Sequence, residues 1–256
     1  MMALVGALGS GCIHAHPKLV APVSVPVAFD PSLLDDDVPG LTDAAERLCA
    51  PLTSAEQKAT GFALAQRAHA LGPKDKAAAM ALARCAAVRA DWESDGKAIE
   101  AVTAVGIEAA KAAGAPRDDP RAAYWLGLNL GLALRQKGLE GIGLLPQEIA
   151  TLQAAQAAPD TDQGGPLRVL GMLYLKAPAW PTGPGDLEMA LDLLKQSVEK
   201  YPSHPLNHLC YAQALRQNDK GAEASAELKR ASELAIPELW GDYAAKWQAD
   251  VQAVAK

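Results

Sequence analysis

The side chains that could do chemistry are few, and two histidines form the most suggestive pair. His204 and His208 lie four positions apart, a spacing that can place both imidazoles on one face of a helix and bind a metal ion. His204 precedes Pro205, however, and the sequence offers no third ligand nearby. We therefore expect no metal site at these histidines and no bound cofactor.

The cysteines also argue against a metal site. Cys49, Cys85 and Cys210 all lie in helical patterns, where a buried cysteine usually behaves as a small hydrophobic residue. No CxxC motif is present, so zinc binding is not indicated. Three cysteines allow at most one disulfide among themselves, and the sequence leaves open whether one forms.

Motifs for catalysis are lacking as well. The chain has no GxSxG, GxGxxG or HExxH motif and no phosphate-binding loop, and no pair of carboxylates stands apart from the solvated charges. The sequence thus predicts no catalytic residue, and we expect a protein that is not an enzyme.

Binding is the remaining role, and four residues are our candidates for a partner or ligand surface: Trp125, Asn129, Tyr174 and Trp180. Aromatic side chains bury large areas on binding and often dominate interfaces. For Trp125 and Tyr174 taken singly, the commoner role of an aromatic residue in a helix is to fill the core. Asn129 is a polar amide in an apolar helical run and, if buried, must find hydrogen-bond partners. It could line a cavity with Trp125, fix the helix register or point outward, and the last two roles together are favoured over the first.

Trp180 lies in a segment of unusual composition, residues 176–185, which contains three prolines and two glycines. Such a segment forms a rigid, exposed loop between helices. Its tryptophan either packs against the body or is offered to a partner, and packing is the commoner arrangement for a loop tryptophan.

The elements that position these residues follow from an internal repeat. The motif Leu170-Gly171-x-x-Tyr174 corresponds to Tyr211-Ala212-x-x-Leu215, and three further pairs recur 34 positions apart: Ala190 with Ala224, Leu194 with Leu228, and Ser197 with Ala231. A period of 34 residues with this alternation of small and large residues is typical of the tetratricopeptide repeat (TPR). The alternative is two unrelated amphipathic hairpins with a shared alanine-rich composition. We predict an all-α fold, a TPR-like right-handed stack of antiparallel helical hairpins forming an α-α superhelix.

Helix boundaries are marked along the body. Ser54 to Gln57 is a capping box that opens a helix running to about Leu71. Asp119-Pro120 is an N-cap followed by a first-turn proline. The pattern predicts ten or eleven helices, including segments 76–91, 97–113, 120–134, 147–157 and a terminal helix near 237–254.

Composition narrows the partners. Half of the residues are hydrophobic but only 5% are aromatic, and the net charge is −6. No basic stripe is available to neutralise phosphates, so we do not expect nucleic acid as a partner.

The N-terminus suggests export. Residues 1–12, MMALVGALGSGC, form a short apolar run that ends in small residues and a cysteine, as in a signal peptide with a lipobox. We expect lipidation of Cys12, a proline-rich tether over 13–40, and the TPR-like domain over 41–256. This arrangement predicts a lipid-anchored protein on the periplasmic side of a bacterial cell envelope, held to the membrane by its lipid only. No basic residue precedes the run, which suggests a start codon further upstream; an incidental cysteine, or a cytoplasmic repeat protein, is the alternative.

Three segments carry a more specific resemblance: AAYWLGLNLG (122–131), GGPLRVLGMLYLKAP (164–178) and GDLEMALDLLKQSVEKYP (185–202). Together they resemble the TatT proteins, the lipoprotein T components of TRAP transporters, over about half of the chain. The resemblance implies a periplasmic lipoprotein with cryptic TPR hairpins, a homotrimer, docking to the solute-binding component of the transporter, and an internal channel for hydrophobic ligands. The alternative function is a general cell-envelope TPR scaffold lipoprotein unrelated to transport.

Overall fold

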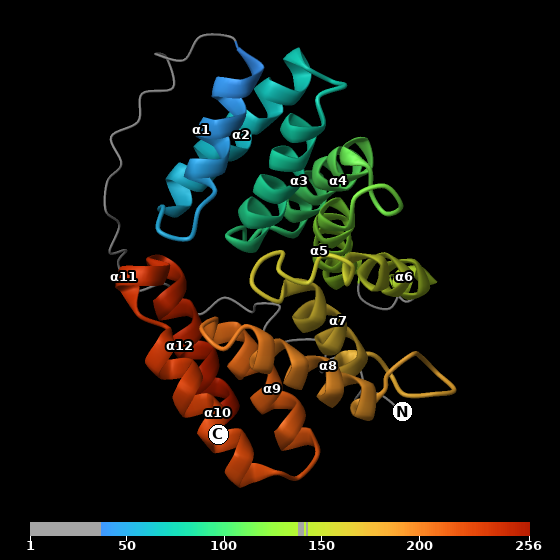
Figure 1. The fold of residues 1–256 in the computed structure, drawn as a ribbon, viewed down its shortest axis with the longest axis vertical. Helices are drawn as coiled ribbons and strands as arrows, with labels where there is room; N and C mark the ends of the chain where they lie inside the picture. The colour runs from blue at the N-terminus through green and yellow to red at the C-terminus, as the bar shows by residue number, and fades with distance from the viewer. Residues whose placement is uncertain (1–36, 138–140, 142) are drawn as a thin grey trace.

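The structure is a computed structural model that describes residues 37–137, 141 and 143–256. In this part of the chain there is no β-strand, only an isolated bridge between Ala179 and Gly185. Twelve helices are present within the described residues (Figure 1): α1 (Val38–Leu48), α2 (Ala55–Leu71), α3 (Lys76–Asp91), α4 (Gly96–Ala113), α5 (Pro120–Lys137), α6 (Leu145–Ala155), α7 (Gly165–Lys176), α8 (Leu187–Lys200), α9 (Pro205–Gln217), α10 (Gly221–Leu234), α11 (Pro237–Trp240) and α12 (Asp242–Ala255).

The helices pack as successive antiparallel pairs, which confirms the predicted fold class. Helices α1 and α2, α3 and α4, α5 and α6, α7 and α8, and α9 and α10 form five hairpins, and α11 and α12 follow the last. The first helix of each hairpin also contacts the first helix of the next. These first helices therefore form a continuous inner layer. None of the helices of the described chain is both long enough and apolar enough to span a membrane.

Local capping explains the helix starts. The Ser54 hydroxyl accepts from the Gln57 amide at 3.2 Å while the Gln57 side chain accepts from the Ser54 amide at 3.0 Å, so the predicted capping box is confirmed. Asp75, Asp95 and Asp186 cap α3, α4 and α8 without a reciprocal bond, each through its carboxylate, which accepts from a backbone amide of the first turn.

Two boundaries differ from the prediction. The tether was expected to run through residue 40, but Asp37 caps α1 and residues 38–40 are its first turn. The remainder of the tether, the signal peptide and Cys12 lie outside the described residues. The single terminal helix is in fact two, because the backbone turns at Gly241, whose φ is +54°.

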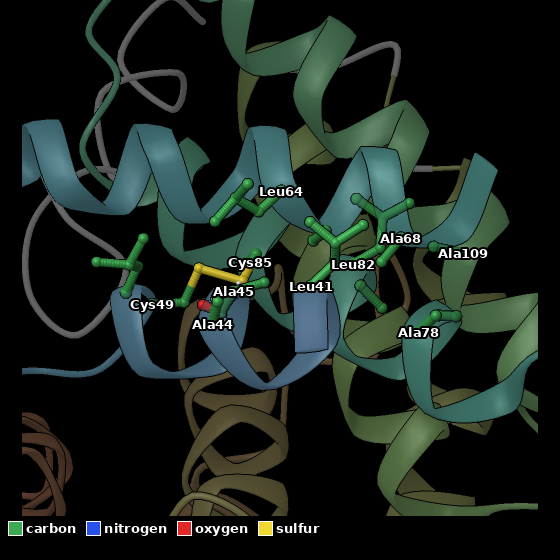
Figure 2. Packing of buried hydrophobic residues seen from close by; sticks show 14 of the residues in the cluster. Leu41, Ala44, Ala45, Cys49, Leu64, Ala68, Ala78, Leu82, Cys85 and Ala109 are labelled. Atoms are coloured by element: carbon green, nitrogen blue, oxygen red, sulfur yellow. Dashed lines mark hydrogen bonds between the residues drawn. A yellow bond between two sulfur atoms is a disulfide. The ribbon is translucent and has the colours of Figure 1, made fainter. Parts of the chain in front are cut away.

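The first hairpins are built around small residues and a disulfide. The core of α1 to α4 is rich in fully buried alanines, among them Ala45, Ala65 and Ala83. Cys49 and Cys85 are bonded here with their Cα atoms 5.5 Å apart, which crosslinks the end of α1 to α3 (Figure 2). Alanine seams let helices approach closely, and the crosslink then fixes that approach.

Glycines mark the closest helix contacts. A Cβ atom at Gly106 of α4 would lie 2.8 Å from the Ala86 Cβ and would also collide with the Asn129 amide. Gly171 of α7 likewise lies against α8, where its nearest neighbours are Leu194 and Leu193. The small residue of the repeat motif therefore lies at the seam of its hairpin and packs against leucines.

Helix α6 buries an acidic residue against α5. Glu148 is only 4% exposed, and a Cβ at Gly131 would lie 2.6 Å from its Oε1 atom. Burial raises the pKa of this carboxyl to about 8. The middle hairpin, α5–α6, which joins the first hairpins to the last ones, thus contains a carboxyl that favours its neutral form.

The stack curves until its two ends meet. In Figure 1, α11 and α12 return toward the turn between α1 and α2, and Gly241 packs on the Pro51 carbonyl and on Leu52. Lys246 of α12 bonds the Asp91 carboxylate and carbonyl oxygen, each at 2.9 Å. We call the five residues that join the ends the closing cluster: Lys58, Asp91, Trp92, Tyr243 and Lys246.

Candidate functional site

A cavity of about 140 Å³ lies on the inner wall of the curve. The inner helices α3, α5 and α7 line one side, and the ends of α9, α11 and α12 line the other. The cavity exists because the last helices return toward the first ones. Residues far apart in the sequence therefore share it.

Aromatic rings form much of the cavity wall. Trp240 and Trp247 pack edge to face with ring centroids 5.0 Å apart, and Tyr243 stacks on Trp247 at 5.2 Å. From the opposite side, Trp125 of α5 packs against Tyr124 at 4.8 Å. All five rings line the cavity, so it offers flat apolar surfaces from α5 and from the last two helices.

A polar network, in which Arg168, Asn207 and Tyr124 are buried and Asp162 is partly exposed to solvent, forms the floor of the cavity. The Arg168 guanidinium donates to Asp162 Oδ2 at 2.5 Å and to Asn207 Oδ1 at 2.7 Å. The Tyr124 hydroxyl donates to the same Asp162 oxygen at 2.7 Å. Burial, and then the Asp162 charge, hold the pKa of Tyr124 well above its usual range. The network joins α5, α7 and α9, and it compensates the charges of both Arg168 and Asp162.

The glycine pair before α7 makes this network possible. Gly164 adopts a left-handed backbone with φ of +90°, and a Cβ there would lie 2.7 Å from the Tyr201 ring. A Cβ at Gly165 would lie 2.6 Å from the Tyr124 ring. The two glycines therefore allow the turn and let Tyr124 reach Asp162.

The two histidines have structural contacts. His204 caps α9, where its Nδ1 accepts from the Leu206 amide at 3.2 Å, and its ring packs 4.7 Å from Trp240. Burial, with a smaller effect of the Arg168 charge, lowers the pKa of His204 to about 3, so the imidazole is neutral. His208 lies with Nδ1 2.6 Å from Glu227 and Nε2 2.8 Å from the Pro202 carbonyl.

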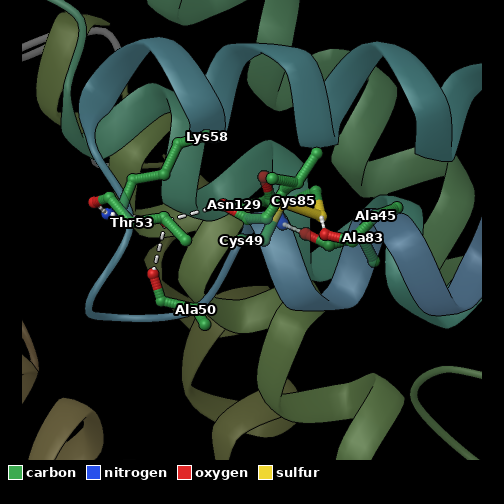
Figure 3. Close-up of a disulfide and its surroundings, with 9 residues drawn as sticks. Ala45, Cys49, Ala50, Thr53, Lys58, Ala83, Cys85 and Asn129 are labelled. Carbon is green, nitrogen blue, oxygen red and sulfur yellow. Dashed lines mark hydrogen bonds between the residues drawn. A yellow bond between two sulfur atoms is a disulfide. The ribbon is translucent and has the colours of Figure 1, made fainter. Parts of the chain in front are cut away.

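The closing cluster stacks two ammonium groups on aromatic rings. The Lys58 nitrogen lies 5.2 Å from the Tyr243 ring centre and the Lys246 nitrogen lies 5.0 Å from that of Trp92. Lys58 also donates to the Thr53 carbonyl and hydroxyl (Figure 3). Burial lowers the pKa of Lys58 to about 8 and that of Lys246 below its usual range.

Of the four predicted binding residues, only Trp125 reaches the cavity. Asn129 is fully buried, and its amide donates to the carbonyls of Ala83 at 2.9 Å and Trp125 at 2.8 Å, so it ties α5 to α3 (Figure 3). Tyr174 is partly buried between α6 and α7, where its hydroxyl accepts from Gln153 at 3.3 Å. These contacts place Asn129 in the register role.

Trp180 is 86% exposed, so the expectation that it packs against the body is wrong. Its loop is nevertheless ordered by backbone hydrogen bonds, from Gly185 to the Pro178 carbonyl at 2.8 Å and from Asp186 to the Tyr174 carbonyl at 3.0 Å. The loop contributes no residue to the cavity lining of the described chain. It projects its tryptophan as a separate surface feature.

The sequence leaves open whether a disulfide forms among these cysteines, and the structure contains one between Cys49 and Cys85. Cys49 and Cys85 are separated by 36 positions and joined by a bond beside the Ala45 carbonyl (Figure 3). Cys210 is fully buried with Leu194 and Ala214 between α8 and α9.

Several lining residues were not singled out from the sequence. Arg168 carried a usable signal, because it is a lone charge in the apolar run GPLRVLGMLYL. Trp240 and Trp247 are two of only five tryptophans and lie close together near the C-terminus. Arg84 and Asp91 carried no signal, because nothing local distinguishes them from solvated charges.

Comparison with known proteins finds a similarity in fold but none in sequence. No model of a known protein family matches this sequence, and no curated protein is significantly similar to it. The chain is similar in structure to TTC0263, a thermophilic TPR protein of Thermus thermophilus, with a TM-score of 0.58 and 21% sequence identity. The match covers 82% of this chain and 99% of that one. The fold is therefore TPR-like.

Proposed function

We propose that this chain is a protein-interaction component of a bacterial cell envelope, and that it docks the solute-binding protein of a TRAP-type transporter. The observation that carries the proposal is the Trp180 loop. An indole that is 86% exposed on a backbone held by its own hydrogen bonds costs little entropy to bury. Such a residue is suited to anchor a protein partner.

Two further features support the choice of partner and place. The glycine pair at 164–165, the loop and the start of α8 coincide with the segments that resemble TatT proteins. The Cys49–Cys85 disulfide favours an oxidising compartment such as the periplasm, because cytosolic thiols are kept reduced.

A binding assay between purified partners tests the docking. The chain would be immobilised and titrated with the solute-binding protein whose gene lies nearest to its own. We expect saturable binding, and we expect Trp180→Ala to weaken it by about 30-fold, the loss typical of an interface hot spot. Leu71→Ala, an exposed apolar residue at the end of α2, is the matched control and should bind normally.

Failure of this assay has a defined meaning. If no transporter genes are nearby and no solute-binding protein binds, the general envelope scaffold is the better hypothesis. If binding occurs but Trp180→Ala and Leu71→Ala behave alike, the docking surface lies elsewhere on the stack.

The anchor and the oligomer are separate parts of the proposal. We infer that Cys12 carries the lipid, so that Cys12→Ala should move the protein from the membrane to the soluble fraction and abolish labelling by a fatty-acid analogue. We also infer a homotrimer for the folded domain, which light scattering of the purified protein would measure directly. A monomer at all concentrations would rule out the trimer.

A further inference from the structure

The cavity described above has the size and walls of a site for a small ring. Its volume is about 140 Å³, close to that of engineered protein cavities that hold a benzene molecule. Trp125 faces it from α5, and Trp240 and Trp247 face it from the end of the chain. An apolar body of one ring or a short branched chain would contact these indoles.

Two tryptophans of the cavity lining carry buried hydrogen-bond donors without acceptors. Trp240 is 8% exposed and Trp247 is 4% exposed, and the indole Nε1 atoms of both are buried and have no partner among the described residues. A buried donor left without an acceptor is destabilising, because its hydrogen bond to water is not replaced. A bound molecule with acceptor oxygens would relieve that cost.

When the ion pairs at the lining are counted, including the one that Lys246 makes from outside it, one positive charge of the lining has no counter-charge among the described residues. Arg168 is paired with Asp162, Asp91 is paired with Lys246, and the buried His204 is neutral. Arg84 of α3 lines the cavity and makes no hydrogen bond or ion pair within the described chain. A monoanion would balance it. A dianion such as phosphate would face the carboxylates of Asp91 and Asp162 with only one cation in surplus.

From these three observations we propose that the cavity binds a small monocarboxylate with a single-ring or branched apolar body. The carboxylate would pair with Arg84 and accept from the indoles of Trp240 and Trp247, while the apolar body would lie against the aromatic walls. The site is separate from the Trp180 loop, so this proposal and the docking proposal can fail independently.

Titration of the oxidised full chain with defined probes tests the ligand class. Benzoate, phenylacetate and isovalerate would be followed by calorimetry and by tryptophan fluorescence, because the indoles are part of the site. We expect at least one of them to bind and to raise the melting temperature. Benzamide, which keeps the ring and loses the charge, should bind about 10- to 100-fold more weakly than benzoate. Inorganic phosphate should not compete.

Single substitutions test which side chains bind the carboxylate. Arg84→Gln should weaken carboxylate binding by about 10- to 100-fold, whereas Arg117→Gln, an exposed arginine outside the cavity, should leave it unchanged. Trp247→Phe keeps an aromatic ring and removes the donor, and should weaken binding by about fivefold.

Circular dichroism would verify that each variant is folded, and the comparison of benzoate with benzamide decides the question on the unaltered chain. Binding of benzamide as tight as that of benzoate, or no binding of any of the three carboxylates at millimolar concentration, would overturn the proposal.

Discussion

The two ends of the helical stack are stabilised by different interactions, although both consist of helical hairpins. The hairpins α1–α2 and α3–α4 are held by alanine seams and by the Cys49–Cys85 crosslink. The last elements, α9 to α12, are held by large rings, with Trp240 and Trp247 packed on each other and on His204. A buried hydrogen-bond network from Arg168 and Asn207 joins them to the middle of the stack.

The difference follows from what each end must cover. Small residues bring neighbouring helices close but bury little area each, so the first hairpins depend on close packing over their whole length. The last helices must cover the end of the stack and also reach across to α3. Large aromatic side chains span that distance and leave a cavity between them, which close alanine packing would not do. We therefore expect a binding function at the aromatic end, where the large side chains leave a cavity.

The largest expected effect tests the aromatic end. Trp247→Ala removes a ring that is 4% exposed and contacts Trp240, Tyr243 and His204. We expect a loss of about 3–5 kcal/mol in the free energy of unfolding, measured by urea denaturation. Trp180→Ala is the control, since an exposed indole should contribute within about 0.5 kcal/mol. Equal losses in both variants would contradict the proposed role of the aromatic end.

The next effect tests the crosslinked end. Replacing both Cys49 and Cys85 by alanine frees a loop of 36 positions in the unfolded chain, and the protein should lose about 3–4 kcal/mol. Urea denaturation without reductant measures the difference. A peptide map of the unreduced wild-type protein should recover the Cys49–Cys85 link, and an unchanged denaturation midpoint in the double variant would show that the alanine seams suffice alone.

A smaller effect tests how tightly the alanine seams are packed. Gly106→Ala places a methyl group 2.8 Å from the Ala86 Cβ and against Asn129, and should cost about 1–3 kcal/mol. Gly221→Ala at the start of α10 has no atom within 4 Å of the new Cβ and should be neutral or slightly stabilising. Thermal unfolding of both variants compares the two ends directly. If Gly106→Ala is tolerated as well as Gly221→Ala, the packing contrast between the ends is wrong.

The smallest effect concerns the joint between the ends. The Glu148 carboxyl has a usual pKa of 4.5 and a folded pKa of about 8, so between these values the native state holds a proton that the unfolded state has lost. The free energy of unfolding should therefore fall as the pH rises from about 6 to about 7, by at most about 1.4 kcal/mol from this group. Glu148→Gln should flatten the slope, and Glu100→Gln, at an exposed position of α4, should not.

Much of the fold could be predicted because its signals are local. Ser54 with Gln57, and Asp119 with Pro120, mark helix starts through contacts a few residues away. The repeat spacing of Ala190 and Ala224 likewise depends on neighbours within one hairpin. These features are visible in any window of a few turns.

The site escaped prediction because it is made by long-range closure. Lys246 meets Asp91 across 155 positions, and Cys49 meets Cys85 across 36. Such long-range contacts cannot be predicted from the residue types alone, because they depend on the cumulative curvature of five hairpins. Trp180 was misjudged for a different reason: composition identified a rigid loop, but the direction in which its indole points is set by the detailed course of that loop.

The contact between α12 and α3 has a consequence for biosynthesis. A simple repeat array can fold progressively as it leaves the ribosome, since each unit needs only its neighbour. Here the ion pair of Asp91 cannot form until Lys246 has been synthesised, 155 residues later. The early hairpins can assemble on the nascent chain, but the ring of helices closes only once α12 has left the ribosomal tunnel. A polypeptide terminated before α12 would lack both the Lys246–Asp91 contact and the part of the cavity wall that α12 supplies.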